Sequence, residues 1–150
     1  MRFLSREWAT GGLPDDEWEE RLSSFRRRVE ELRGLLGHGA EALLEDVNLH
    51  DAQPHSFQVA DDTVALQVLA GDLQHGYEWI ELRYVGAAVG SADEVLAWID
   101  LPGCEVLYDE VDVSGDEYVH RLLLDPVGEF TVRFQALEVH RAPAIPDDRR

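Results

Sequence analysis

Five side chains have the types that acid–base chemistry or metal binding requires, namely His50, Asp51, Glu110, His120 and Glu129. His50 and Asp51 are adjacent, so they can pair as a base and its orienting carboxylate only where a bulge or turn breaks strand alternation. Convergence of His50 and His120 with one of the two glutamates would offer two imidazoles and a carboxylate to a divalent metal. Because no spacing requires that convergence, we treat all five residues as binding candidates and none as catalytic.

A structural interpretation fits the same residues, and we favour it. A His-Asp pair that precedes a strand commonly caps backbone groups. His120 shares a strand face with Tyr118 and Leu122, which predicts a partly buried core histidine. The acidic run of residues 109–116 does not fit a calcium loop, because Arg121 falls where a bidentate glutamate is required.

Signature motifs for catalysis and cofactor binding are missing from the sequence. The chain has no glycine-rich phosphate loop, no nucleophile elbow, no paired cysteine motif and no H-E-x-x-H. Its single cysteine, Cys104, lies beside Glu105, whose negative charge disfavours a thiolate nucleophile. The sequence therefore predicts no cofactor, and it favours a protein that is not an enzyme.

The charge of the chain narrows the possible partners. The net charge is −18, from 31 acidic residues and 13 basic residues that are all arginine. Residues 47–140 hold 18 of the acidic residues and only three arginines. Such a field repels phosphate backbones and anionic membranes, so we expect no nucleic acid and no membrane as partner. A basic protein is the partner that this charge favours.

The helical part comes first in the chain. Apolar residues recur at spacings of 4, 3, 4, 3 and 4, which predicts an amphipathic helix over residues 14–36. They are Trp18, Leu22, Phe25, Val29, Leu32 and Leu36. The stripe suits either a coiled-coil dimer or packing within one domain, and we favour packing because the repeat is short. Residues 40–47 predict a second, shorter helix.

Alternating apolar residues after position 52 predict strands, with turns at residues 61–62, 114–116 and 125–128. Strands that short turns connect must pair antiparallel. The predicted fold is α+β, with the amphipathic helix and the short second helix packed on a mostly antiparallel meander of about six strands. Residues 48–52, which we call the hinge, join a helical part (1–47) to a β part (48–141), and a loose tail (142–150) follows within one domain.

Location and assembly follow from what the sequence lacks. No apolar run approaches the roughly 20 residues of a membrane span, and the first residues contain no apolar signal-peptide core. A single cysteine agrees with a reducing compartment. We therefore expect a cytoplasmic protein, and a monomer or weak dimer.

Four short segments carry a resemblance to a known family. They are residues 1–8 (MRFLSREW), 49–52 (LHDA), 108–110 (YDE) and 129–134 (EFTVRF). They resemble an uncharacterised bacterial family that opens with Met-(Lys/Arg)-aromatic-Phe-Thr-Lys-Glu-Trp and carries a Leu-His-Asp step before its strands. Leu4, Ser5 and Arg6 depart from that opening. The resemblance implies a bacterial, cytoplasmic α+β domain and transfers no catalytic residue.

Three functional hypotheses follow. The first is a non-enzymatic protein-binding module with an acidic β surface, comparable by analogy to immunity or anti-toxin proteins. The second is a metal-dependent enzyme centred on His50, Asp51 and His120. The third is a small-ligand pocket in the β part, although we favour core filling as the explanation of its aromatic residues. Those aromatic residues are Trp79, Tyr84, Tyr108 and Phe134.

Overall fold

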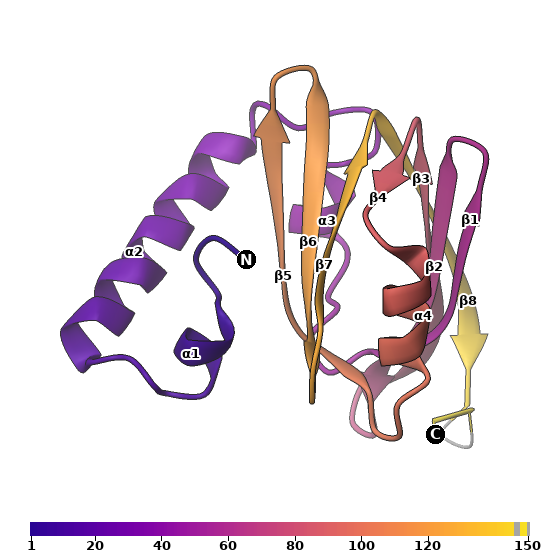
Figure 1. The fold of residues 1–150 in the computed structure, drawn as a ribbon, viewed down its shortest axis with the longest axis horizontal. Helices are drawn as coiled ribbons and strands as arrows, with labels where there is room; N and C mark the ends of the chain where they lie inside the picture. Colours follow the sequence, from indigo (N-terminus) through magenta and orange to yellow (C-terminus); the bar gives the residue numbers. More distant parts are fainter. Residues whose placement is uncertain (146–147, 150) are drawn as a thin grey trace.

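Two antiparallel sheets face each other in the computed structural model, which describes residues 1–145 and 148–149. Within these residues, four α-helices and eight strands form an α+β fold (Figure 1). The prediction of an α+β fold with a mostly antiparallel set of strands is therefore confirmed. The described residues hold eight strands where about six were predicted. One predicted strand is divided into two, and the short strand β4 is an addition.

The first sheet has the strand order β1-β2-β3-β8, and the second has the order β4-β7-β6-β5. The strands of the first sheet are β1 (Gln53–Ala60), β2 (Thr63–Asp72), β3 (Gly76–Val85) and β8 (Ala136–Ala144). Those of the second are β4 (Ala88–Val89), β5 (Glu105–Ser114), β6 (Glu117–Asp125) and β7 (Glu129–Phe134). All six strand pairings are antiparallel in the described chain.

Apolar alternation predicts one last strand over residues 129–139, but the structure has two strands there, which belong to different sheets. The chain leaves the second sheet after Phe134, and the N–H of Gln135 donates to the carbonyl of Val85 at 2.9 Å. β8 then pairs with β3 as far as Ala144. Residues 142–144 therefore belong to a strand and not to the predicted loose tail, of which residues 146, 147 and 150 lie outside the described residues.

The core lies between the two sheets and follows the period of two that strands impose. Inward side chains of both sheets are 0–7% exposed and form one apolar cluster. Nine core side chains of strands β2, β3, β6 and β7 are fully buried, with an exposed fraction of 0%: Val64, Leu66, Val68, Leu82, Tyr84, Leu122, Leu124, Val132 and Phe134. Helix α4 (Ala92–Ile99) adds Val95 and Ile99 to this cluster. Ser91 is the N-cap of α4, since its Oγ accepts the N–H of Glu94 at 3.3 Å.

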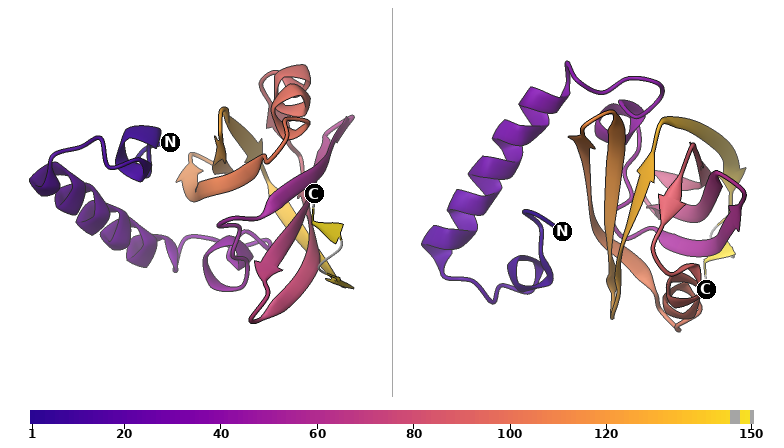
Figure 2. Two further views of the ribbon diagram at one scale, coloured as in Figure 1. Left: turned by 90° about the horizontal axis from the view of Figure 1, so that it is seen from below. Right: turned by 45° about the horizontal axis from the view of Figure 1, so that its top comes forward.

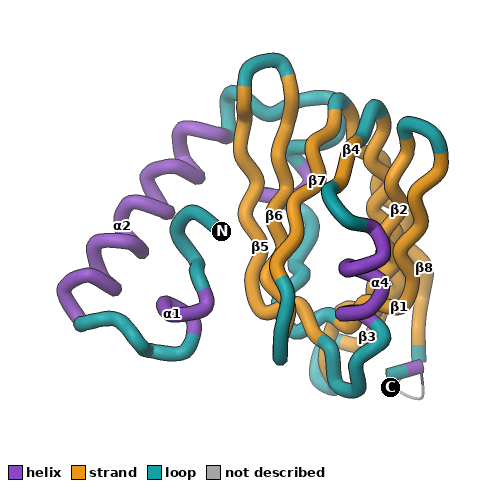
Figure 3. The backbone as a smooth tube through the Cα atoms, viewed as in Figure 1, coloured by secondary structure: helices purple, strands orange, loops and turns teal. Residues whose placement is uncertain are grey.

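The N-terminal arm, residues 1–33, lies outside the two-sheet body. It holds α1 (Arg6–Ala9) and α2 (Asp15–Leu32), and residues 1–9 lie between α2 and the second sheet (Figures 1 and 3). α2 leans away from the body in two further views (Figure 2). The first part of its apolar stripe contacts the first residues of the chain, with Trp18 stacked on Trp8, whereas Leu32 is buried and Leu36, just past the helix, packs against the core cluster.

α2 ends one turn earlier than its apolar pattern predicts. The last helical residue is Leu32, and the N–H groups of Leu35 and Leu36 both donate to its carbonyl. A short helix, α3 (Ala42–Glu45), follows and leads into the hinge. None of the helices in the described residues is long and apolar enough to cross a membrane.

Candidate functional site at the hinge

The hinge connects the edge of the second sheet to the first strand of the first sheet. The N–H of Asp51 donates to the carbonyl of Val106 at 2.9 Å, and the N–H of Val106 donates to the carbonyl of Ala52 at 2.8 Å. Ala52 immediately precedes β1, whereas Val106 belongs to β5. These two backbone bonds hold the two sheets together at this end.

The hinge also brings His50 and Asp51 together. Asn48 Oδ1 accepts the N–H of His50 at 3.1 Å, which forms a local turn. Asp51 then adopts a left-handed conformation with φ of 61°, which aspartate tolerates better than most residues. As a result, His50 Nδ1 lies 3.0 Å from Asp51 Oδ2. The turn that such a pair requires is therefore present.

A pocket of about 360 Å³ opens beside this pair. Four carboxylates line it, from Asp46, Asp51, Asp72 and Glu78, and its other lining residues are Asn48, His50, Ala70, Gly71 and Arg149. These residues come from the end of α3, the hinge, the β2–β3 hairpin and the C-terminal segment. We call this cavity the hinge pocket.

Two of the chain's own arginines lie at the hinge pocket. Arg141 donates to Glu78 Oε1 at 2.6 Å and to the carbonyl of Asp46. Arg149 donates to Glu105 Oε1 at 2.6 Å, and this bond, followed by one to Tyr77, raises the pKa of Arg149. In the described part of the chain, no arginine pairs with the carboxylates of Asp46 and Asp51. The pocket therefore retains negative charge that no arginine of the described residues neutralises, although Asp51 and Asp72 lie 3.0 Å from the Nδ1 atoms of His50 and His75.

A row of aromatic contacts leads from the hinge pocket to the arm. The His50 ring meets Tyr108 edge-on at 5.0 Å, and Tyr108 meets Trp8 edge-on at 5.2 Å. Trp8 in turn stacks on Trp18 with ring centroids 5.1 Å apart. One wall of the pocket is thus supported from behind by side chains of the arm.

His120 lies in a different environment, in the interior between the sheets. Its side chain is fully buried, with Nδ1 at 2.7 Å from the Tyr84 hydroxyl and Nε2 at 2.9 Å from Asp109 Oδ2. Since a carboxylate only accepts, Nε2–H donates to Asp109, and in the neutral imidazole Nδ1 then accepts the Tyr84 hydroxyl. Burial, followed by the charge of Asp109, raises the pKa of Tyr84 well above its usual value. The prediction of a core histidine fits, but burial is complete and not partial.

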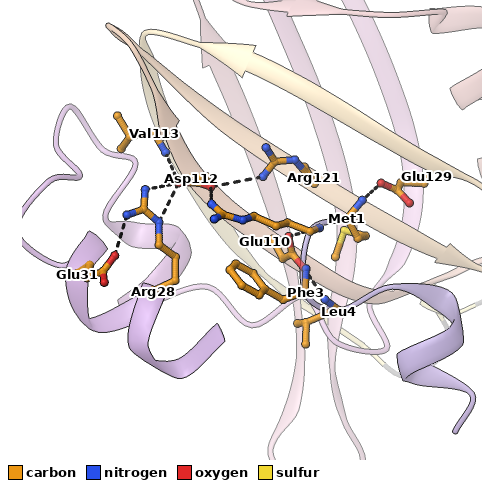
Figure 4. Close-up of polar contacts among 11 residues, drawn as sticks. Met1, Phe3, Leu4, Arg28, Glu31, Glu110, Asp112, Val113, Arg121 and Glu129 are labelled. Atoms are coloured by element: carbon orange, nitrogen blue, oxygen red, sulfur yellow. Dashed lines mark hydrogen bonds and ion pairs between the residues drawn. The ribbon is translucent and has the colours of Figure 1, made fainter. Parts of the chain in front are cut away.

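Glu110 and Glu129 hold the arm and not a ligand (Figure 4). The two carboxylate oxygens of Glu110 accept the N–H groups of Arg2, Phe3 and Leu4 at 2.8, 2.7 and 2.6 Å. Glu129 forms an ion pair with the amino group of Met1. The glutamates and His120 therefore point to opposite faces of the second sheet.

The five predicted site residues are thus distributed over three environments: the hinge pocket, the sheet interior and the arm contact. In residues 1–145 and 148–149, no group of three or more histidine, cysteine or acidic residues is placed to hold a metal ion. The two-histidine metal site is therefore not assembled. Asp109, the partner of His120, was missed because its position depends on the register between β5 and β6, which no local pattern shows.

The predicted aromatic pocket is not assembled either. Tyr84 and Phe134 contact each other in the core at 5.1 Å, as core-filling residues do. Trp79 packs against His55 at 4.6 Å, and neither residue belongs to the core cluster. Tyr108 contacts the arm. These four aromatic side chains therefore line no common cavity.

Comparisons with known proteins supply no relative for this chain. No protein-family model matches it, and neither a curated protein nor a solved structure is significantly similar to it. The geometry of the hinge pocket is therefore the basis for a functional proposal, and the family resemblance of the short motifs remains a prediction.

Proposed function

We propose that the protein is a non-enzymatic binding module whose hinge pocket receives a cationic side chain of a basic protein partner. The observation that carries this proposal is the pocket of about 360 Å³ with four carboxylates in its lining. Carboxylates bind guanidinium and ammonium groups through charge-assisted hydrogen bonds. We further propose that the protein works in the bacterial cytoplasm.

Two features of the chain support a guanidinium or ammonium group as the bound chemistry. Arg141 binds the lining residue Glu78 at 2.6 Å, and the guanidinium of Arg149 belongs to the pocket lining, which supports a guanidinium group as a suitable guest. In addition, the acidic surplus of residues 47–140 surrounds the pocket with a negative field. Such a field speeds the encounter with a cationic partner, in a manner that salt suppresses.

The test compares two pairs of aspartates at opposite ends of the same strands. Asp51→Asn with Asp72→Asn alters the hinge pocket, whereas Asp61→Asn with Asp62→Asn alters the β1–β2 turn. Both double variants remove two negative charges, and asparagine tolerates the left-handed conformation of Asp51 and Asp61. A fluorescent hexa-arginine peptide serves as the probe, and fluorescence anisotropy at low ionic strength measures its affinity.

The hinge-pocket variant is expected to bind the peptide at least about tenfold more weakly than the wild type, because two charge-assisted contacts are lost. The turn variant should lose only the roughly twofold effect of a weaker long-range field. Equal losses in both variants would mean that the peptide responds to net charge alone, and the hinge pocket would then be rejected as the site.

A further inference from the structure

The arm and the body meet on the outer face of the second sheet, and this contact goes beyond the hinge pocket. Val119 and Leu123 point outward from β6, yet they are only 1% and 2% exposed. The arm covers this face (Figures 1 and 2). Leu4 and Trp8, at 5% and 7% exposed, belong to the same outer layer and not to the core between the sheets.

Polar groups fix the position of the arm on this face (Figure 4). Glu110, only 3% exposed, accepts three backbone N–H groups of residues 2–4. Asp112, at 7% exposed, accepts Arg28 Nε at 3.1 Å and Arg28 Nη2 at 2.5 Å. Carboxylates of β5 therefore bind hydrogen-bond donors of the arm. A second copy of the chain carries the same donors, so its arm could make the same contacts.

The segment that connects the arm to the body is glycine-rich, but the body holds its second half, since Leu36 packs against the core cluster and the His38 carbonyl accepts the N–H of Leu137 at 2.9 Å. Residues 34, 37 and 39 are glycines, and His38 and Gly39 both adopt positive φ values of 54° and 88°. Leu35 is 57% exposed in this turn. The apolar stripe of α2 continues in the sequence to Leu36, although the helix ends at Leu32. A change of backbone direction at the exposed residues 33–35 would carry the arm away from its own body while Leu36 and His38 keep their contacts with it.

We infer that two copies of this chain exchange arms, so that the arm of each copy docks on the second sheet of the other. The exchange preserves every contact between arm and body, and only the linker changes its conformation. The occupant that this face fits is therefore the arm of a second copy. In the exchanged dimer, the Trp8–Tyr108 contact behind the hinge pocket would form between two chains. The inference does not depend on the proposed function.

Charge reversal across the arm contact tests the exchange. Arg28→Glu places a glutamate against Asp112, and Asp112→Arg places an arginine against Arg28, so each variant alone has like charges at the contact. When the two variants are mixed and warmed, exchange pairs Arg28 of one chain with Asp112 of the other. It also pairs the introduced glutamate with the introduced arginine. Both contacts of the exchanged heterodimer are then complementary.

The expected result is a species of twice the 17.0 kDa chain mass in the mixture, measured by size exclusion with light scattering. Native mass spectrometry with one isotope-labelled variant should show that it holds one chain of each kind. The matched control uses Arg133→Glu and Glu117→Arg, whose ion pair at 3.8 Å lies wholly within the second sheet. Arm exchange cannot restore that pair, so the control mixture should gain no heterodimer.

A deletion in the linker tests arm exchange independently, in case a charge-reversed variant does not fold. Deletion of Gly34 and Leu35, both exposed, shortens the linker and keeps Leu36 on the core, so that the arm no longer reaches its own sheet and must dock on a second copy. The deleted chain should therefore be a dimer with a protected arm in hydrogen exchange. A monomeric deletion variant with an unprotected arm would overturn the inference. So would a charge-reversed mixture that stays monomeric, or a control mixture that dimerises equally well.

Discussion

The two sheets are held together mainly by apolar burial, whereas the arm combines a buried apolar contact with charge-assisted hydrogen bonds. The facing sheets bury apolar side chains that are 0–7% exposed. The stripe of α2 is only half-buried, apart from Leu32 at 1%, and carboxylates of β5 fix the arm in position. Apolar burial is insensitive to salt and pH, whereas charge-assisted contacts depend on both. The comparison therefore indicates a stable body with an arm that can open separately.

The largest expected effect is the difference in unfolding free energy lost when a core leucine and a leucine of the arm are each replaced by alanine. Leu82→Ala in β3 removes a fully buried side chain and should lower the free energy of unfolding by about 2–5 kcal/mol. Leu22→Ala in α2 makes the same change at a half-buried position and should cost about 1 kcal/mol or less. Urea denaturation followed by circular dichroism measures both. Equal losses would show that arm and body unfold as one unit.

Glu110→Gln tests the polar side of the comparison. The neutral amide has one accepting oxygen, so it cannot accept all three N–H groups of residues 2–4. We expect the arm to lose about 1.5–3 kcal/mol of docking free energy, seen as faster hydrogen exchange in residues 2–9. Glu117→Gln, an exposed change at the start of β6, is the control. Faster exchange throughout the body would contradict a separately opening arm.

Local patterns predicted most of the β part, because alternation and turn residues are readable along the chain. They could not show where the chain changes sheets. Apolar alternation from Phe130 to Phe134 continues through Ala136, so one long strand was expected, yet the step at Gln135 leads into the other sheet. The choice between a continuous and a divided strand depends on which partner strands are near, and this is a tertiary property.

The candidate site was predictable only where its geometry is local. The turn that pairs His50 with Asp51 uses neighbouring residues, so the sequence indicated its requirement. Glu110, in contrast, contacts backbone N–H groups more than 100 positions away, and backbone donors have no sequence signature. The same holds for the hinge pocket, whose lining comes from four distant segments.

The buried hydrogen bond between Tyr84 and His120 tests whether a polar contact of the body affects global stability without affecting the arm. Tyr84→Phe removes the hydroxyl that donates to His120 Nδ1 and leaves a buried acceptor without its partner. The expected cost is about 1–3 kcal/mol of global unfolding free energy, with no selective effect on the arm. Tyr118→Phe, at a half-buried position, is the control, and its loss should stay below about 0.5 kcal/mol. Calorimetry with hydrogen exchange distinguishes global from local loss.

The smallest effect is a dependence of arm docking on acid pH. Burial opposes the ionisation of Asp112, but hydrogen bonds from Arg28 and the Val113 N–H outweigh it and hold the pKa of Asp112 below its usual value. An aspartate with a lowered pKa in the docked state stabilises docking above its ordinary pKa of about 3.9. That contribution is lost as the pH falls through the lower pKa of the docked state.

Hydrogen exchange of residues 2–9 should therefore show full protection at neutral pH and progressive loss below about pH 4, once intrinsic exchange rates are corrected. Asp112→Asn removes the titrating group while it keeps a similar shape. Its arm should be less protected at neutral pH and should lose less protection on acidification than the wild-type arm. An unchanged acid transition in Asp112→Asn would assign the pH dependence to other carboxylates, and would remove Asp112 from the contacts that distinguish the arm from the body.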